Sequence, residues 1–205
     1  MIKSPVFWLL LTLIAIAIVT ALGPAEATLG TNARVVYLHG VWVWAALIAI
    51  FASGLIGLVG LITRKEKLHY WSRALGRTGL IFWITYLPIS LWAMQTNWNG
   101  LFLLEPRWRM AIVFAIGGLF LQIGIILLKN PVWASISNFV YMLILFLAIQ
   151  RTEQVMHPPS PIFNSEAILI QYYFIALLLL TLIAIWLVTR MLYKFDHPYT
   201  PNAGR

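Results

Sequence analysis

The chain of 205 residues contains no cysteine. This absence excludes thiolate metal sites, disulfide exchange and covalent cofactor attachment through a C-x-x-C-H motif within the chain. The short motifs of zinc proteases, serine hydrolases and nucleotide-binding proteins (H-E-x-x-H, G-x-S-x-G and the P-loop) are absent as well. No residue pattern therefore points to catalysis by these routes.

Charge is scarce too. Only 10% of the residues are charged and 61% are hydrophobic, whereas soluble domains carry about 25% charged residues. An apolar run of about 20 residues crosses a bilayer as a helix. Six uncharged apolar runs fit that length, at about 5–23, 36–62, 79–96, 110–128, 132–149 and 167–189. We predict an all-α, polytopic membrane protein in which residues 1–205 form a single transmembrane domain with six transmembrane helices.

The net charge of +8 is unevenly distributed over this topology. One side carries ten basic residues: Lys3, Arg64, Lys65, Lys67, Arg73, Arg77, Lys129, Arg190, Lys194 and Arg205. The other side carries Arg34, Arg107, Arg109 and Arg151. By the positive-inside rule the side with more basic residues is cytoplasmic. We therefore predict that the protein lies in the cytoplasmic (inner) membrane with both termini on the cytoplasmic side. The excess charge reflects topology and attraction to anionic lipid, not nucleic-acid binding.

Two segments follow from this orientation. We expect the residues from Arg64 to Thr78 to form a basic cytoplasmic loop, and residues 190–205 to form a short cytoplasmic tail. The first run has features of a signal peptide, with Lys3 before it and an A-x-A-like site at Ala25-Glu26-Ala27. Its length favours a retained first helix, and cleavage would leave the orientation of the other helices unchanged.

Small and polar residues occur inside the apolar runs. Gly54, Gly57 and Gly60 recur at helical spacing and are expected to let a neighbouring helix approach closely. Gln122 and Asn138 lie at membrane depth. Such residues are typical hydrogen-bonding partners between helices, and we favour that interpretation over a transport path.

The segment from Trp92 to Arg109, WAMQTNWNGLFLLEPRWR, is a polar and tryptophan-rich interruption on the external side. Two histidines, His39 and His157, are predicted on the same side. One interfacial histidine is ordinarily a satisfied polar residue, but two on one side favour a shared ligand. Neutral imidazole is a common axial ligand of haem iron, and external arginines are suited to pair with haem propionates. Tryptophans also gather at membrane interfaces without any cofactor.

The same segment resembles a motif of the haem-handling membrane proteins of cytochrome c biogenesis, the CcmC/CcsA type. That family carries W-G-x-x-W-x-W-D-P/A-K/R between two external histidines. Here Trp98 matches the first tryptophan, and Pro106 and Arg107 match the end of the motif. Phe102, Leu104 and Glu105 stand where the family has its second tryptophan, third tryptophan and aspartate. Tyr37-Leu38-His39 with Trp44 resembles the first histidine motif, and the residues from Met156 to Ser160 resemble the second. The resemblance covers about residues 30–190.

The resemblance implies a non-covalent, b-type haem at the external face, with His39 and His157 as ligands of the haem iron. Trp98, Phe102 and Trp108 would form a shelf for the ring, and Arg107 or Arg109, beside Glu105, would lie near a propionate. Such a protein holds haem and passes it to a haem chaperone, an apocytochrome or other membrane subunits. It is a carrier and not an enzyme.

Two alternatives stay open from the residues. One is an electron-transfer subunit with a permanent b-type haem near a quinone, although pairs of histidines within one helix are missing. The other is a structural membrane anchor without haem, in which the histidines and tryptophans are interface residues. No sequence feature excludes the anchor.

Overall fold

The computed structural model describes residues 4–153, 162–164 and 166–196, and every regular element in these residues is helical. The helices are α1 (Pro5–Ala21), α2 (Ala33–Thr63), α3 (Glu66–Trp98), α4 (Pro106–Leu128), α5 (Pro131–Arg151) and α6 (Ile168–Asp196). Five of them, α2 to α6, are long and apolar enough to cross a membrane, and α1 is a shorter apolar helix. The prediction of a helical, multi-pass membrane protein is confirmed at this level.

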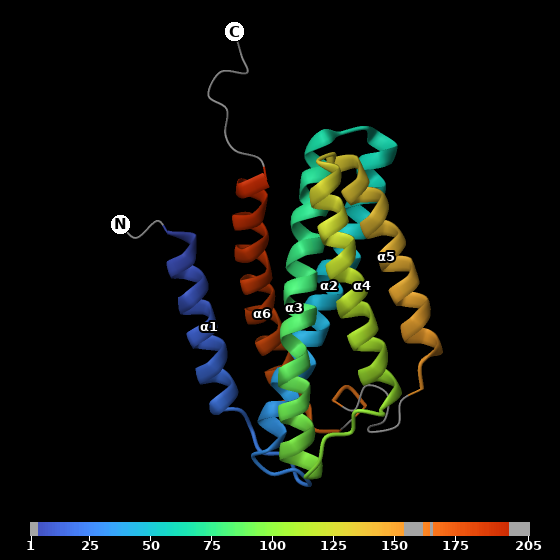
Figure 1. Cartoon of the computed structure of the whole chain (residues 1–205). Coiled ribbons are helices and arrows are strands. Elements are labelled where there is room, and N and C mark those ends of the chain that lie inside the picture. Colours follow the sequence, from blue (N-terminus) through green and yellow to red (C-terminus); the bar gives the residue numbers. More distant parts are fainter. Residues whose placement is uncertain (1–3, 154–161, 165, 197–205) are drawn as a thin grey trace.

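The helices run side by side between two ends of the bundle (Figure 1). At one end, here called the turn end, Arg64 and Lys65 join α2 to α3, and Lys129 and Asn130 join α4 to α5. The first residue of α1 and the last residue of α6 lie at the same end (Figure 1). The opposite end, here called the loop end, carries the longer connections 22–32, 99–105 and 152–167.

Helix α3 corrects the prediction of a basic loop from Arg64 to Thr78. The helix begins at Glu66 and has 33 residues, so the predicted span 79–96 was too short. Its first turns bury His69, Ser72 and Gly76. These residues are polar or small, so this part of the helix does not stand out as an apolar run in the sequence. In α6 the helix continues to Asp196. The first seven residues of the predicted tail are therefore helical.

Local signals set the other helix boundaries close to their predicted positions. Proline opens α1, α4 and α5, where its missing N–H costs nothing. Glu105 caps α4, because its Oε2 accepts a hydrogen bond from the Trp108 backbone N–H at 2.6 Å. Three helices end at left-handed residues, namely Arg64, Asn99 and Lys129, with φ of 54°, 51° and 52°.

Glycines let α2 pack closely on α3 and α5, as the sequence predicted. A Cβ added at Gly57 would lie 2.8 Å from the Ser72 Oγ and 3.0 Å from the Ser135 Cα. One added at Gly60 would lie 3.1 Å from the His69 Nδ1. A Cβ at Gly57 does not fit without movement of α3 or α5, and a Cβ at Gly60 requires its neighbours to shift by a few tenths of an ångström, so these glycines let the helices lie close together.

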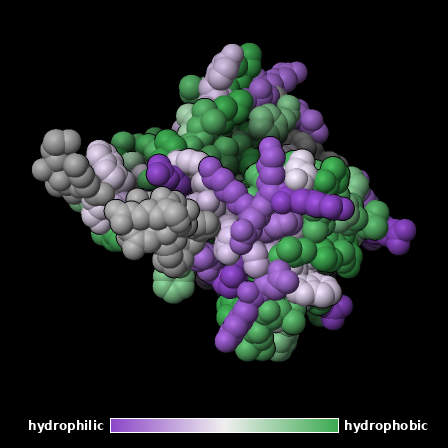
Figure 2. Space-filling view, turned by 90° about the horizontal axis from the view of Figure 1, so that it is seen from above, coloured by the Kyte–Doolittle hydropathy of each residue, from purple (hydrophilic) through white to green (hydrophobic). Residues whose placement is uncertain are grey.

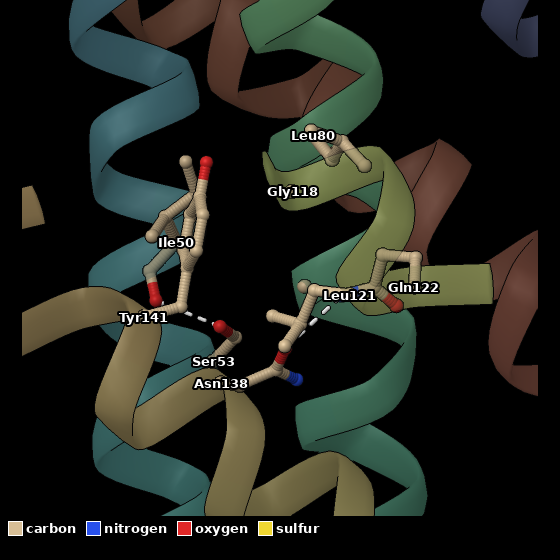
Figure 3. A pocket seen from close by; sticks show the side chains of 9 residues that line it. Ile50, Ser53, Leu80, Gly118, Leu121, Gln122, Asn138 and Tyr141 are labelled. Carbon is tan, nitrogen blue, oxygen red and sulfur yellow. Dashed lines mark hydrogen bonds between the residues drawn. The ribbon is translucent and has the colours of Figure 1, made fainter. Parts of the chain in front are cut away.

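The predicted role of Gln122 and Asn138 is confirmed as well. The Gln122 Nε2 donates to the Asn138 Oδ1 at 3.1 Å, and the Asn138 Nδ2 donates to the Ser72 carbonyl oxygen at 2.9 Å. These bonds join α3, α4 and α5 in the interior. Figure 3 shows Gln122 and Asn138 beside a small cavity of about 10 Å³, which Leu80, Leu121 and Tyr141 also line. That volume is near the lower limit for a single water molecule.

Candidate functional site at the loop end

His39 lies in the second turn of α2 and faces α3. Its side chain is half-buried, and its ring centroid is 5.7 Å from that of Tyr86. The next residue is Gly40, where an added Cβ would meet the Phe174 ring of α6 at 3.0 Å. Glycine at this position therefore lets α6 approach α2 closely one residue after His39. The imidazole itself packs against the aromatic ring of Tyr86 from α3.

The start of α4 lies at the level of Tyr86 and not at the tip of α3. The Trp83 Nε1 donates to the Ala111 carbonyl oxygen at 3.0 Å, and the rings of Trp83 and Tyr86 are 5.1 Å apart. Residues 99–105 therefore run back along the bundle before α4 begins (Figure 1). The first turn of α4 is thereby brought to the depth of His39.

Glu105, Arg107 and Arg109 are the charged residues at the start of α4. The Glu105 carboxylate acts electrostatically on both Tyr86 and Arg107. Arg107 is half-buried, whereas Arg109 is exposed. The structure thus places His39 of α2 beside Tyr86 of α3, and Glu105 and Arg107 at the start of α4 at a similar depth.

The three aromatic residues predicted to form a shelf have different surroundings. Trp98 is the last residue of α3, twelve residues beyond Tyr86, which is about 18 Å along a helix. Trp98 is half-buried, and 41% of Phe102 is exposed in the connection that follows. Trp108 has only 6% of its surface exposed and belongs to the packed first turn of α4. The three rings therefore lie at different depths.

His157, the second predicted ligand, lies outside the described residues. It belongs to the connection between α5 and α6, which starts and ends at the loop end. Within the described part of the chain, no group of three or more histidine, cysteine, aspartate or glutamate residues is arranged to hold a metal ion. A haem needs only one or two axial ligands from the protein, so this result concerns other metal centres.

Two features of the structure were not predicted from the sequence. Tyr86, the residue that joins His39 to α4, stands in an apolar run two residues before Pro88 and carries no signal of its own. At the turn end, the His69 Nδ1 lies 2.7 Å from the Ser135 Oγ, beneath an open pocket of about 380 Å³. Ser135 is fully buried, so this pair links α3 to α5 and its hydroxyl is not accessible as a nucleophile.

Comparisons with protein-family models, with curated proteins and with solved structures found no match to this chain.

Proposed function

We propose that this protein holds haem at the loop end of a six-span bundle in the cytoplasmic membrane and delivers it to a partner protein, as the cytochrome c assembly family does. The observation that supports the proposal is the common depth of His39 and the first turn of α4. A histidine and a half-buried arginine at one level offer haem iron an axial ligand and a propionate a counter-charge. The remainder of the proposal rests on the family resemblance.

The orientation follows from charge. Of the basic residues that the structure describes, eight lie toward the turn end and four toward the loop end, so we assign the turn end to the cytoplasmic side. Helix α1 has 17 residues, which is the lower limit for a transmembrane helix, and it is the sixth span of this proposal. Haem would then be held on the external side, in contact with chaperones or apocytochromes outside the cell membrane.

The chemistry of the site fits a carrier. His39 supplies a neutral ligand, and Tyr86 provides an aromatic surface beside it. Glu105 is engaged in capping α4, so it is not available as a general base.

The proposal is tested by adding haem to the detergent-purified protein and recording visible spectra of the oxidised and reduced forms. We expect a bound-haem band in the wild type. In His39→Ala and His157→Ala the apparent affinity for haem should fall at least about tenfold, because an axial bond is lost. His197→Ala, which changes a histidine just after α6, is the matched control and should bind like the wild type.

Other spectral results would contradict the proposal. An unchanged band in both His39→Ala and His157→Ala overturns the ligand assignment. No band in the wild type, after reconstitution with haem, favours a structural anchor. A tightly held haem that is reduced reversibly by quinol favours an electron-transfer subunit.

Arg107 and Arg109 give a second, finer prediction. Arg107→Gln should weaken haem binding by about ten- to a hundredfold, because a charge-assisted hydrogen bond to a carboxylate contributes about 1.5–3 kcal/mol. Arg109→Gln removes the same charge from an exposed position two residues away and should change the affinity less than twofold. Titration of both variants with haem at one ionic strength measures the difference. Equal losses of haem affinity in the two variants would show that the arginines attract haem only through long-range electrostatics and that neither binds a propionate directly.

A further inference from the structure

A second cluster of charge lies at the turn end, where α6 ends against α3. The Arg77 Nη1 is 2.7 Å from both carboxylate oxygens of Asp196, and the Arg73 Nε is 3.5 Å from the Asp196 Oδ2. The side chains are largely withdrawn from solvent. Their exposed fractions are 14% for Arg77, 13% for Arg73 and 5% for Asp196.

The charges in this cluster do not balance. Two guanidinium groups share one carboxylate, which leaves one positive charge without a counter-charge in a poorly solvated position. In addition, the Arg77 Nε is buried without a hydrogen-bond partner in the described part of the chain. Burying an unpaired charge is costly. The cluster therefore has a surplus positive charge that an anion would neutralise.

Aromatic side chains border the cluster. Trp71 of α3 stacks between Trp186 and Tyr193 of α6, with centroid distances of 5.5 Å and 4.4 Å. Arg190 lies over the Trp186 ring at 5.8 Å and adds another cation. Half of the Trp186 surface is exposed. Tryptophan and tyrosine in such a stack are typical of the boundary between lipid headgroups and hydrocarbon.

The length of α3 places the cluster at that boundary. Its 33 residues span about 50 Å, whereas the hydrocarbon core is about 30 Å thick. About 20 Å of α3 therefore lies outside the core, divided between its two ends, and Arg73 and Arg77 lie about 10 and 16 Å from Glu66 along the helix. Long arginine side chains near the end of a span extend toward the headgroup region, where the lipid phosphates are.

The distribution of charge between the two ends of the bundle also favours anion binding at the turn end. The loop end has four basic residues and four acidic ones, Glu26, Glu105, Glu153 and Glu166. Among the described residues, the acidic ones at the turn end are Glu66 and Asp196, against eight basic residues. The described part of the turn end thus carries an excess of positive charge, and Figure 2 shows hydrophilic side chains gathered there within a hydrophobic rim.

We propose that the junction of α3 and α6 is a binding site for the phosphate headgroup of an anionic phospholipid. Arg73 and Arg77 bind the phosphate, and the Trp71–Trp186–Tyr193 stack lies along the lipid chains. The site depends on the membrane placement of the bundle and is independent of haem binding at the loop end. A failure of either proposal leaves the other standing.

The test compares thermal unfolding of the full chain in nanodiscs of pure phosphatidylcholine and in nanodiscs that also contain phosphatidylglycerol. Phosphatidylglycerol should raise the Tm of the wild type by about 4 °C, the shift expected when a ligand binds only the folded state. Arg73→Gln should abolish this shift, because it removes the surplus cation and leaves the Arg77–Asp196 pair intact. Asp196→Asn should enlarge the shift, because both arginines then lack their carboxylate.

Arg64→Gln is the matched control, since Arg64 is an exposed arginine in the α2–α3 turn. It should keep the full shift. Equal losses in Arg64→Gln and Arg73→Gln would overturn the site in favour of general surface attraction. A loss in Asp196→Asn as large as in Arg73→Gln would show that the cluster only fastens α6 to α3. An equal shift from inorganic phosphate in phosphatidylcholine nanodiscs would show that the site binds free anions and not lipid.

Discussion

Replacing Gly57 by leucine is expected to lower the free energy of unfolding by about 3 kcal/mol or to prevent assembly of the bundle. The Cβ alone would lie 2.8 Å from the Ser72 Oγ and 3.0 Å from both the Cα and the carbonyl oxygen of Ser135. Backbone atoms cannot rotate away, so α5 would have to move outward from α2. That movement also strains the bonds that Asn138 makes to Ser72 on the neighbouring helix.

The matched control is Gly117→Leu. Gly117 is exposed on α4, and apart from its chain neighbours and the local helix backbone no atom lies within 4 Å of its added Cβ. Leucine there replaces a poor helix former by a good one and is expected to leave the Tm unchanged or to raise it slightly. Thermal unfolding of both variants in one detergent measures the contrast. Equal effects would show that Gly57 does not set the distance between helices.

The sequence predicted the class and most of the helix boundaries because the length of an uncharged apolar run carries that information. The start of α3 was predicted wrongly because its first turns contain Arg73 and Arg77 and bury His69 and Ser72. Such a helix is stabilised by packing of small and polar side chains, which hydropathy does not record. The pairing of Arg77 with Asp196 likewise joins residues 119 positions apart.

The loop end shows a second limit of sequence reasoning. The resemblance identified His39 and the segment from Trp98 to Arg107, but it gave no depth for either. Whether residues 99–105 stay at the tip of α3 or run back along the bundle depends on the register of α3 against α4. That register is set by contacts such as Trp83 with Ala111. Tyr86 contacts His39 only because the α2–α3 register places it there.

The two amides in the interior provide the other large expected effect. Asn138→Leu should lower the free energy of unfolding by about 2–3 kcal/mol, because interhelical hydrogen bonds contribute about 0.6–1.7 kcal/mol each and a buried partner left unsatisfied adds to the cost. Asn138 is 2% exposed. It donates to the Ser72 carbonyl oxygen and Oγ and accepts from the Gln122 Nε2. The Gln122 Oε1 is already buried without a hydrogen-bond partner in the described residues.

A double-mutant cycle distinguishes lost hydrogen bonds from altered packing. Gln122→Leu alone leaves the Asn138 Oδ1 without its donor and should cost about 1 kcal/mol. With both residues changed to leucine, no unpaired amide remains between α4 and α5, so the double variant should cost at least about 1 kcal/mol less than the sum of the single variants. Gln95→Leu, at an exposed position on α3, is the control for adding a leucine. Strictly additive effects would mean that the two amides do not depend on each other, and the stabilisation would then come from packing around the cavity they line.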